Sequence, residues 1–387
     1  MPELTYLDHH AAAPPAPEAT AAMAAARQAA WANPSSVHAA GRESRKLLEG
    51  ARERVAAAIG ARASDVALVG GGTEACNLGV LGLARRAEST EQSPDGQHIV
   101  TTEIEHPAVA RPIEALERCG MRVTRLALPN GAPFGTDQLA AALSQDTCLV
   151  ALGWVNHETG TRLPLSAYSE LCATRGIPLF VDATQAVGKL PVDVRDLGVD
   201  ALAMASHKLG GPAGAGALWV RRDRQLSPVL LGGGQERGRR AGTPDVVAQV
   251  GFGAACSQVA ARLLAQPRLA ALQGRLEAGL QGLGALVNGD PSQRVATVVN
   301  VSFKGLRGDE LVAALDVEGV ACASGAACSS GLTEPSPVIT AMYPQDPARA
   351  RGALRFSFGP ETRDADVDRA LEKMALVLNR ARAAGAS

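Results

Sequence analysis

Polar and ionisable residues follow the ends of several short apolar stretches in the first two thirds of the chain. The set consists of Thr73, His106, Asn156, His157, Glu158, Asp182, Gln185, Ser206, His207 and Lys208. If the apolar stretches are strands of one open α/β sheet, their carboxyl ends form a ligand crevice. Because the clusters follow successive stretches, we expect these side chains to share one site.

Lys208 is the member of this set that suits covalent catalysis. It lies just after the apolar stretch Ala201–Ala205 and is followed by Gly210-Gly211-Pro212. A lysine at the edge of a buried crevice loses hydration, which lowers its pKa and makes the neutral amine available for a Schiff base. A solvated loop lysine is the alternative, and the neighbouring His207 and glycines favour a built site.

Two other segments could bind charged parts of a ligand, and each also has a structural interpretation. Gly70–Glu74 joins a strand to a helix, where glycines and free N–H groups can hold an anion, although a tight turn capped by Thr73 is the favoured interpretation of this segment taken alone. Asp182 ends an apolar strand and needs a partner to stay ionised. A pyridinium nitrogen would supply that partner, and a helix cap is the alternative.

The elements that must position these residues alternate between strand-like and helix-like stretches. The strand-like stretches are 66–69, 98–102, 148–154, 179–182, 201–205 and 217–220. The helix-like stretches between them include 74–85, 108–118, 137–142 and 165–175. Strands this uniformly apolar predict an α/β fold with a mainly parallel sheet covered on both faces.

The pattern changes after the glycine-rich stretch Gly232–Gly242. A long helical region over 244–283 precedes short strand-like and helix-like stretches, which predicts a smaller α+β domain. We therefore expect an N-terminal arm of residues 1–15 packed against the smaller domain, a large domain of residues 16–260 and a small domain of residues 261–387.

Composition excludes several classes of partner. The 387 residues carry a formal net charge of −1, which leaves no electrostatic footprint for nucleic acid or an anionic membrane. The first residues lack the basic flank and apolar core of a secretory signal, and Ala19–Ala32 is too weakly apolar to span a bilayer. These features predict a cytoplasmic protein.

The seven cysteines are scattered and odd in number: Cys76, Cys119, Cys148, Cys172, Cys256, Cys322 and Cys328. In a reducing compartment most are expected to be small buried hydrophobes, and their spacing does not match a zinc ribbon. His9 and His10 lack further ligands, so no metal site is expected. Cys322 ends an apolar stretch and is assigned to the core, whereas Cys328 lies among Ser, Gly and Ala.

Five motifs occur in order along the chain: Val-Asp-Ala-Thr-Gln-Ala-Val-Gly-Lys (181–189), Ser-His-Lys-Leu-Gly-Gly-Pro (206–212), Gly-Gly-Gly-Gln-Glu-Arg-Gly-Arg-Arg-Ala-Gly-Thr (232–243), Ala-Ser-Gly-Ala-Ala-Cys-Ser-Ser-Gly-Leu-Thr-Glu-Pro-Ser (323–336) and Leu-Arg-Phe-Ser-Phe-Gly (354–359). Together they resemble the cysteine desulfurases of the class V aminotransferase family, NifS/IscS type, group I. The resemblance runs from Tyr6 nearly to the C-terminus. It implies fold-type I with a seven-stranded sheet, and pyridoxal 5′-phosphate as cofactor.

The resemblance also implies roles for individual residues. Lys208 would form the internal aldimine and move the Cα proton, Asp182 would pair with the pyridine nitrogen, and Gln185 would bind the phenolic oxygen. His106 would stack on the ring and act as acid or base. The remaining cofactor contacts would come from Gly72, Thr73, Asn156, His157, Ser206, His207 and, from a partner subunit, Thr243. That last contact implies a homodimer.

Substrate binding and sulfur transfer are assigned by the same resemblance. Asn33 and Arg355 would bind the carboxylate of L-cysteine, which the planar fork of arginine matches. Cys328 would attack the substrate sulfur, forming a persulfide and releasing L-alanine, with an iron–sulfur scaffold or another protein as acceptor. Two positions depart from the family: His157 replaces a usual asparagine, and Ala205 replaces a phosphate-binding serine for which Ser206 could compensate.

These features predict a pyridoxal-phosphate-dependent cysteine desulfurase. The first alternative is a related class V aminotransferase or a selenocysteine lyase, neither of which needs the nucleophile Cys328. The second alternative is a catalytically silent homologue that acts as a scaffold. The sulfur acceptor is a property of partner surfaces, and the sequence does not identify it.

Overall fold

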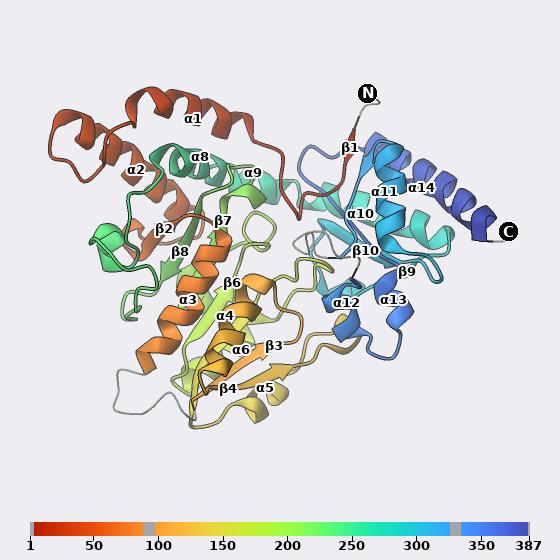
Figure 1. Cartoon of the computed structure of the whole chain (residues 1–387), viewed down its shortest axis with the longest axis horizontal. Helices are drawn as coiled ribbons and strands as arrows, with labels where there is room; N and C mark the ends of the chain where they lie inside the picture. The colour runs from red at the N-terminus through yellow and green to blue at the C-terminus, as the bar shows by residue number, and fades with distance from the viewer. Residues whose placement is uncertain (1–3, 88–96, 326–333, 386–387) are drawn as a thin grey trace.

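The computed structural model describes residues 4–87, 97–325 and 334–385. Figure 1 shows a larger α/β region that contains α1 to α8 and a smaller region that contains β9 to β12 with α10 to α14. One hydrophobic core lies within the smaller region, and two pack on the central sheet, one of which also takes in Val298 and the helix Pro337–Met342 of the smaller region. The pocket described below lies where the two regions meet.

A seven-stranded sheet forms the centre of the larger region, as predicted. Its strands, in spatial order, are β2 (Val66–Val69), β8 (Gly216–Val220), β7 (Ala201–Ala205), β6 (Leu179–Asp182), β5 (Thr147–Gly153), β3 (His98–Thr102) and β4 (Arg122–Leu126). β8 is antiparallel to β2 and β7, and the remaining neighbours are parallel. Side chains on both faces of the central strands are buried, which explains their continuous apolar sequences.

β4 is the strand that the apolar pattern does not predict. It lies at the edge of the sheet, its one partner among the described strands is β3, and none of its five residues is fully buried. Its sequence, Arg-Val-Thr-Arg-Leu, is therefore mixed rather than apolar. The other edge strand, β2, is buried and apolar and was predicted, so the partial exposure of β4 is the reason that a search for apolar runs does not find it.

Helices cover both faces of the sheet. α3 (Gly72–Ala87) and α4 (Pro107–Arg118) pack on one face. The other face is covered mainly by α1 (Pro17–Ala29), α2 (Ala39–Ala57), α6 (Leu165–Thr174) and α8 (Val246–Cys256), with α5 (Thr136–Ala142) and α7 (Val194–Leu197) nearby. Gly79 allows α3 to approach the sheet, because a Cβ there would lie 2.2 Å from Cε2 of Phe180.

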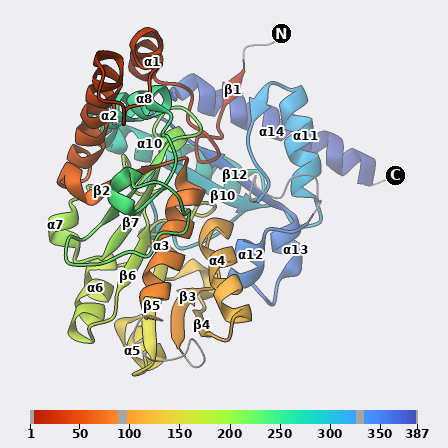
Figure 2. The same cartoon turned by 60° about the vertical axis from the view of Figure 1, so that its left-hand side comes forward.

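The helical region predicted over 244–283 consists of three helices: α8, α9 (Val259–Leu264) and α10 (Gln266–Gly282). Within the described residues, Val246–Leu264 is the stretch whose length and apolar composition could cross a membrane, but half of it is buried inside the fold. Figure 2 shows α8 beside α1 and α2, against which it packs. Core helices commonly have this composition.

The smaller region is built on two short sheets. One is antiparallel, with β10 (Val298–Ser302) between β12 (Ala353–Ser357) and β9 (Leu286–Val287); the other pairs β1 (Thr5–Tyr6) in parallel with β11 (Val320–Ala321). The helices are α10, α11 (Gly308–Val317), α12 (Pro337–Met342), α13 (Pro347–Arg351) and α14 (Asp364–Gly385). Leu7 and Cys322 belong to this core, so the N-terminal segment is anchored here.

Candidate active site

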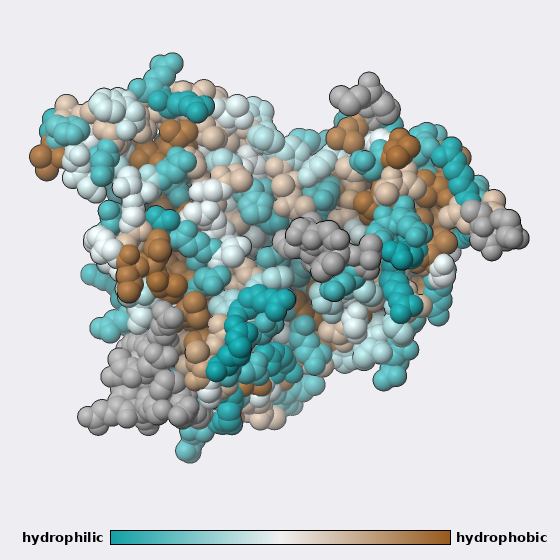
Figure 3. Space-filling view, viewed as in Figure 1, coloured by the Kyte–Doolittle hydropathy of each residue, from teal (hydrophilic) through white to brown (hydrophobic). Residues whose placement is uncertain are grey.

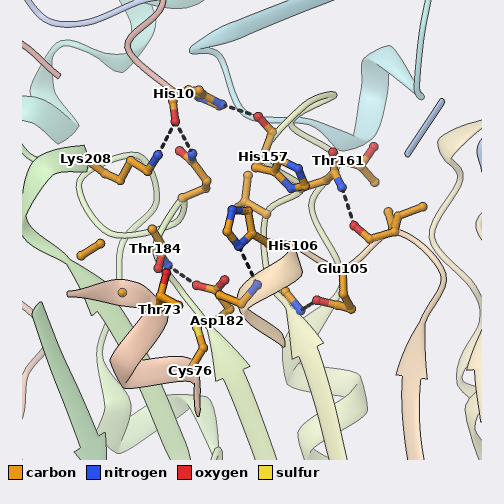
Figure 4. Close-up of a pocket in the computed structure, with 18 of the residues that line it drawn as sticks. His10, Thr73, Cys76, Glu105, His106, His157, Thr161, Asp182, Thr184 and Lys208 are labelled. Carbon is orange, nitrogen blue, oxygen red and sulfur yellow. Dashed lines mark hydrogen bonds between the residues drawn. The ribbon is translucent and has the colours of Figure 1, made fainter. Parts of the chain in front are cut away.

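A pocket lies at the carboxyl ends of β3, β5, β6 and β7, where the two regions meet (Figure 4). Ten residues predicted from the sequence line it: Gly72, Thr73, His106, Asn156, His157, Asp182, Gln185, His207, Lys208 and Arg355. Most of them follow strands of one parallel sheet, so the expectation of a shared crevice is met by the geometry. Arg355 comes from β12 of the smaller region.

Four predicted residues are not part of this pocket as described. Ser206 is fully buried, and its hydroxyl lies beside Gly211 rather than in the pocket. Ala205 presents only a methyl group to the pocket, and compensation by Ser206 remains a prediction. Asn33 and Thr243 are exposed outside the pocket, and Asn33 accepts a bond from the Ser35 backbone N–H. Cys328 lies outside the described residues.

Lys208 reaches the N-terminal segment from the end of β7. It closes the single turn of 3-10 helix Ser206–Lys208, and the chain turns away at Gly210, whose φ is +78°. Its Nζ donates to the carbonyls of His10 at 2.6 Å and Ala11 at 2.7 Å. Both of these contacts of the amine at the pocket wall are therefore with backbone oxygens.

Gln185 is oriented by contacts at both ends of its amide. Its Nε2 donates to the carbonyl of His10 at 2.9 Å, and its Oε1 accepts from Nζ of Lys189 at 2.6 Å. Burial lowers the pKa of Lys189 well below its ordinary value, with Lys208 and Arg262 adding to the effect. The N-terminal segment thus contributes one carbonyl that binds both Lys208 and Gln185.

Asp182 lies at the end of β6 beside a buried thiol. Its Oδ1 accepts from the backbone N–H of Thr184 at 2.9 Å, and the Cys76 side chain is hydrogen-bonded to it. Burial, followed by the charge of Asp182, raises the pKa of Cys76 well above its ordinary value. Cys76 therefore stays a thiol that donates to the carboxylate.

His106 is the N-cap of α4, and this role determines its tautomer. Its Nδ1 accepts from the backbone N–H of Ala108 at 3.0 Å, so the hydrogen of the neutral ring is on Nε2. Burial lowers the pKa of His106, while the charge of Asp182 opposes that change. The ring meets His157 edge to face, with centroids 5.0 Å apart and planes at 85°.

Asn156 organises the turn that carries His157. Its Oδ1 accepts from the backbone N–H groups of Glu158 and Thr159, each at 2.9 Å, and its Nδ2 donates to the carbonyl of Ile104. The amide is therefore committed to backbone groups and to the Thr159 hydroxyl, and its predicted contact with the cofactor remains a prediction. His157 is the side chain of this turn that faces His106.

Arg355 joins three segments of the chain at the pocket. It is 2% exposed, its Nη2 donates to Oδ1 of Asp8 at 2.7 Å, and its Nη1 donates to the carbonyl of His157 at 3.0 Å. A buried guanidinium needs an anionic partner, and Asp8 supplies it here. Binding of a substrate carboxylate by Arg355 remains a prediction.

One protein family matches most of the chain. The family described as aminotransferase class-V matches residues 5–370. The chain belongs to this family. Lys208, Asp182 and His106 all lie within the matched residues.

Several curated relatives of this class-V chain are named cysteine desulfurases. An IscS-like cysteine desulfurase of Mycobacterium tuberculosis is 42% identical and covers 99% of this chain and 100% of the relative. A putative cysteine desulfurase IscS 1 of Bacillus subtilis is 37% identical, covering 98% and 99%. Identity therefore extends over the full length of both chains.

Solved structures of class-V proteins have the same fold. A NifS-like protein superposes with a TM-score of 0.89 at 28% identity, covering 97% of this chain and 99% of that one. SspA in complex with cysteine superposes with a TM-score of 0.79 at 29% identity, covering 92% and 99%. These likenesses confirm the predicted fold class.

Several lining residues of the class-V pocket were not predicted from the sequence. They are His10, Cys76, Glu105, Thr161 and Thr184. Thr184 could have been predicted, because it lies two residues after Asp182 at the end of the same strand. The others lie inside a helix, before a helix or in the N-terminal segment, and only the packing brings them to the pocket.

Glu105 gives the pocket wall a pH-dependent effect on stability. Its carboxylate accepts from Thr102 Oγ1 at 2.7 Å and Gly153 N at 2.8 Å, but burial raises its pKa to about 7. This folded-state pKa exceeds the unfolded value near 4.5, so protonation of Glu105 stabilises the folded state. That contribution to the free energy of unfolding is fully present below about pH 4.5 and is lost as pH rises through about 7.

We therefore expect Glu105→Gln to change how stability depends on pH. Between about pH 5 and pH 8 the free energy of unfolding of the wild type should fall by roughly 2 kcal/mol relative to the variant. Urea denaturation at several pH values measures this difference. The exposed Glu103→Gln is the matched control, and parallel curves for Glu105→Gln and wild type would contradict the prediction.

Proposed function

We propose that this chain is a pyridoxal-phosphate-dependent cysteine desulfurase that converts L-cysteine to L-alanine and transfers the sulfur to Cys328. The observation that carries the proposal is the meeting of Lys208, Asp182 and His106 in one pocket beside the start of α3. An amine, a carboxylate and a flat imidazole fit the functional parts of the cofactor. The relatives named cysteine desulfurase support the substrate.

The residues present fit a phosphorylated pyridine. The phosphate would lie at the N-terminus of α3, where Gly72 leaves room: a Cβ there would lie 2.8 Å from Cβ of Ala205. His207 lines the same pocket, and burial, followed by the charge of Lys208, lowers its pKa to about 4, so it would donate as a neutral ring. Asp182 would bind the ring nitrogen, and the bound cofactor would supply an electron sink.

The chain's own residues would then do three tasks. Lys208 would carry the proton that leaves the substrate Cα, and Arg355 would orient the substrate carboxylate. The thiolate of Cys328 would attack the substrate sulfur: an S–S bond forms, the carbon–sulfur bond breaks, and its electron pair stays on carbon. That carbon takes a proton and becomes the methyl group of L-alanine.

We infer that the active form is a homodimer to which Thr243 contributes across the interface. The segment that ends at Thr243 is tied to the edge of the sheet at β2: Glu236, at a left-handed φ of +49°, accepts from Arg52 at 2.9 Å and from the Leu68 backbone N–H at 2.8 Å. Leu231, at the start of this segment, is 78% exposed. Figure 3 shows apolar side chains at the surface on the larger region's side of the molecule.

We also propose a sulfur acceptor and a cellular compartment for this chain. The similarity to proteins named IscS favours an acceptor in iron–sulfur cluster assembly. A reducing, cytoplasmic environment suits a reactive cysteine and the buried thiols Cys76 and Cys256.

The proposal is tested with L-cysteine and the Cys328→Ser variant. Purified wild type should release L-alanine and gain one sulfur on the peptide that contains Cys328, whereas the variant should do neither. Alanine quantification and peptide mass spectrometry measure the two outcomes. Replacing the exposed Cys119 with serine is the matched control, and it should behave as wild type.

The alternatives give different results in the same assay. A related aminotransferase or selenocysteine lyase would keep its activity in Cys328→Ser. A catalytically silent homologue would bind no chromophore and turn over neither substrate. Equal persulfide in wild type and Cys328→Ser would refute the assignment of the nucleophile.

A further inference from the structure

Two buried polar atoms face each other in the wall of the pocket. Nε2 of His157 lies 3.7 Å from Oε1 of Glu158, just beyond hydrogen-bond distance. Within the described residues neither atom has a hydrogen-bond partner, and Glu158 is fully buried. Leaving both atoms unsatisfied costs free energy, so a hydrogen between them is the arrangement that the geometry favours.

The rest of both residues is firmly held. The other carboxylate oxygen of Glu158 accepts from the Ser336 hydroxyl at 2.6 Å, and its carbonyl accepts from Asn300 at 3.2 Å. The carbonyl of His157 accepts from Arg355 and contacts the His10 ring. The two polar atoms without a partner therefore face each other, and a small rotation would bring them within hydrogen-bond distance.

The position of the hydrogen decides whether Nδ1 of His157 is a hydrogen-bond donor or an acceptor. If Glu158 is a carboxylate, Nε2 carries the ring hydrogen and donates to it, and Nδ1 is an acceptor. If the pair gains a proton, that proton sits on Glu158 or on the ring. In the first case the carboxyl group donates to Nε2 and the ring hydrogen moves to Nδ1; in the second both nitrogens carry hydrogen. Either way, Nδ1 becomes a donor.

We propose that His157 and Glu158 form a proton-binding pair that switches Nδ1 of His157 from hydrogen-bond acceptor to donor when the pair is protonated. His157 would then be a positioning residue whose contact with a ligand in the pocket depends on pH. An asparagine, which the family usually has here, would offer a permanent amide donor instead. The effect on catalysis rests on the proposed function, whereas the protonation of the pair does not.

The surroundings make the pair sensitive to pH. Burial raises the pKa of Glu158, while Ser336 and Arg355 lower it. Burial lowers the pKa of His157 well below its usual value, and His106, Arg355 and Lys208 lower it further. In the part of the chain that the structure describes, His10, His106, Lys208 and Arg355 are the titratable and charged side chains that face the pair. The macroscopic pKa therefore belongs to the pair, and the protonated form is favoured as pH falls.

Nitrogen NMR of the full chain labelled with ¹⁵N-histidine tests the protonation directly. The His157 signals are those missing from His157→Asn. We expect Nδ1 to change from unprotonated to protonated as pH falls from about 9 to about 5, and this change should be absent in Glu158→Gln. An Nδ1 that keeps one state over that range, or that titrates equally in Glu158→Gln, would overturn the proposal.

Two further measurements separate the pair from a purely structural role. Ser336→Ala removes a donor to the carboxylate and should move the midpoint of the Nδ1 transition upward by about one pH unit. In the holoenzyme, kcat/KM for L-cysteine should contain an ionisation at the wild-type NMR midpoint, and His157→Asn should lack it. Superimposed pH profiles would overturn the proposed role in catalysis. Absence of any alanine from wild type would instead reject the proposed function and leave the NMR result standing.

Discussion

Replacing Lys208 with alanine is expected to abolish release of L-alanine from L-cysteine, with kcat/KM lower by about 10⁴-fold or more. Under the proposed function, the variant would lose the covalent attachment for the cofactor and the proton carrier at the substrate Cα in one change. The amine lies at the pocket wall, where Nζ donates to the carbonyls of His10 and Ala11. A coupled alanine assay measures the rate, and the visible absorbance of the purified protein reports the attachment.

The matched control for this variant is Lys304→Ala. Lys304 is a largely exposed lysine whose Nζ lies 3.6 Å from Asp346. It is not one of the residues that line the pocket. It should keep wild-type activity and absorbance. If Lys208→Ala lost less than about tenfold in kcat/KM, its assignment as the attachment residue would be wrong.

The central sheet was predictable because strands that are buried on both faces have continuous apolar sequences. β7, whose sequence is Ala-Leu-Ala-Met-Ala, and β8 have no exposed residue, so their strands read as apolar runs. β4 has one side open to solvent and was missed. The break between α8 and α9 was also missed, since Ser257 and Gln258 contain neither glycine nor proline to mark it.

The pocket was predictable to the extent that its residues follow strands. Asp182 and Lys208 lie at strand ends, where a parallel sheet gathers side chains without help from the rest of the fold. Cys76 lies on the inner side of a helix, where its sequence context fits any buried thiol, and its bond to Asp182 depends on how α3 packs. The pairing of Arg355 with Asp8 connects residues 347 positions apart, a separation that no local pattern encodes.

Replacing Arg355 with glutamine is expected to lower the free energy of unfolding by about 3–5 kcal/mol, the usual cost of breaking a buried ion pair from one side. The guanidinium is 2% exposed and joins β12 to Asp8 of the N-terminal segment and to the carbonyl of His157. Its loss leaves the Asp8 carboxylate without its cation and loosens the segment that carries His10 and Ala11. Urea denaturation followed by circular dichroism measures the change, and the exposed Arg351→Gln is the matched control.

A double-mutant cycle with Asp8→Asn separates the structural role of Arg355 from its role in substrate binding. If the ion pair provides the stability, the double variant should be no less stable than Arg355→Gln alone, because the unpaired carboxylate is gone. Its KM for L-cysteine should nevertheless stay raised, since Asp8→Asn does not restore a cation for the substrate carboxylate. Additive losses of stability would show that Asp8 and Arg355 act independently. A wild-type KM in Arg355→Gln would remove Arg355 from substrate binding and leave it as the link between the N-terminal segment and β12.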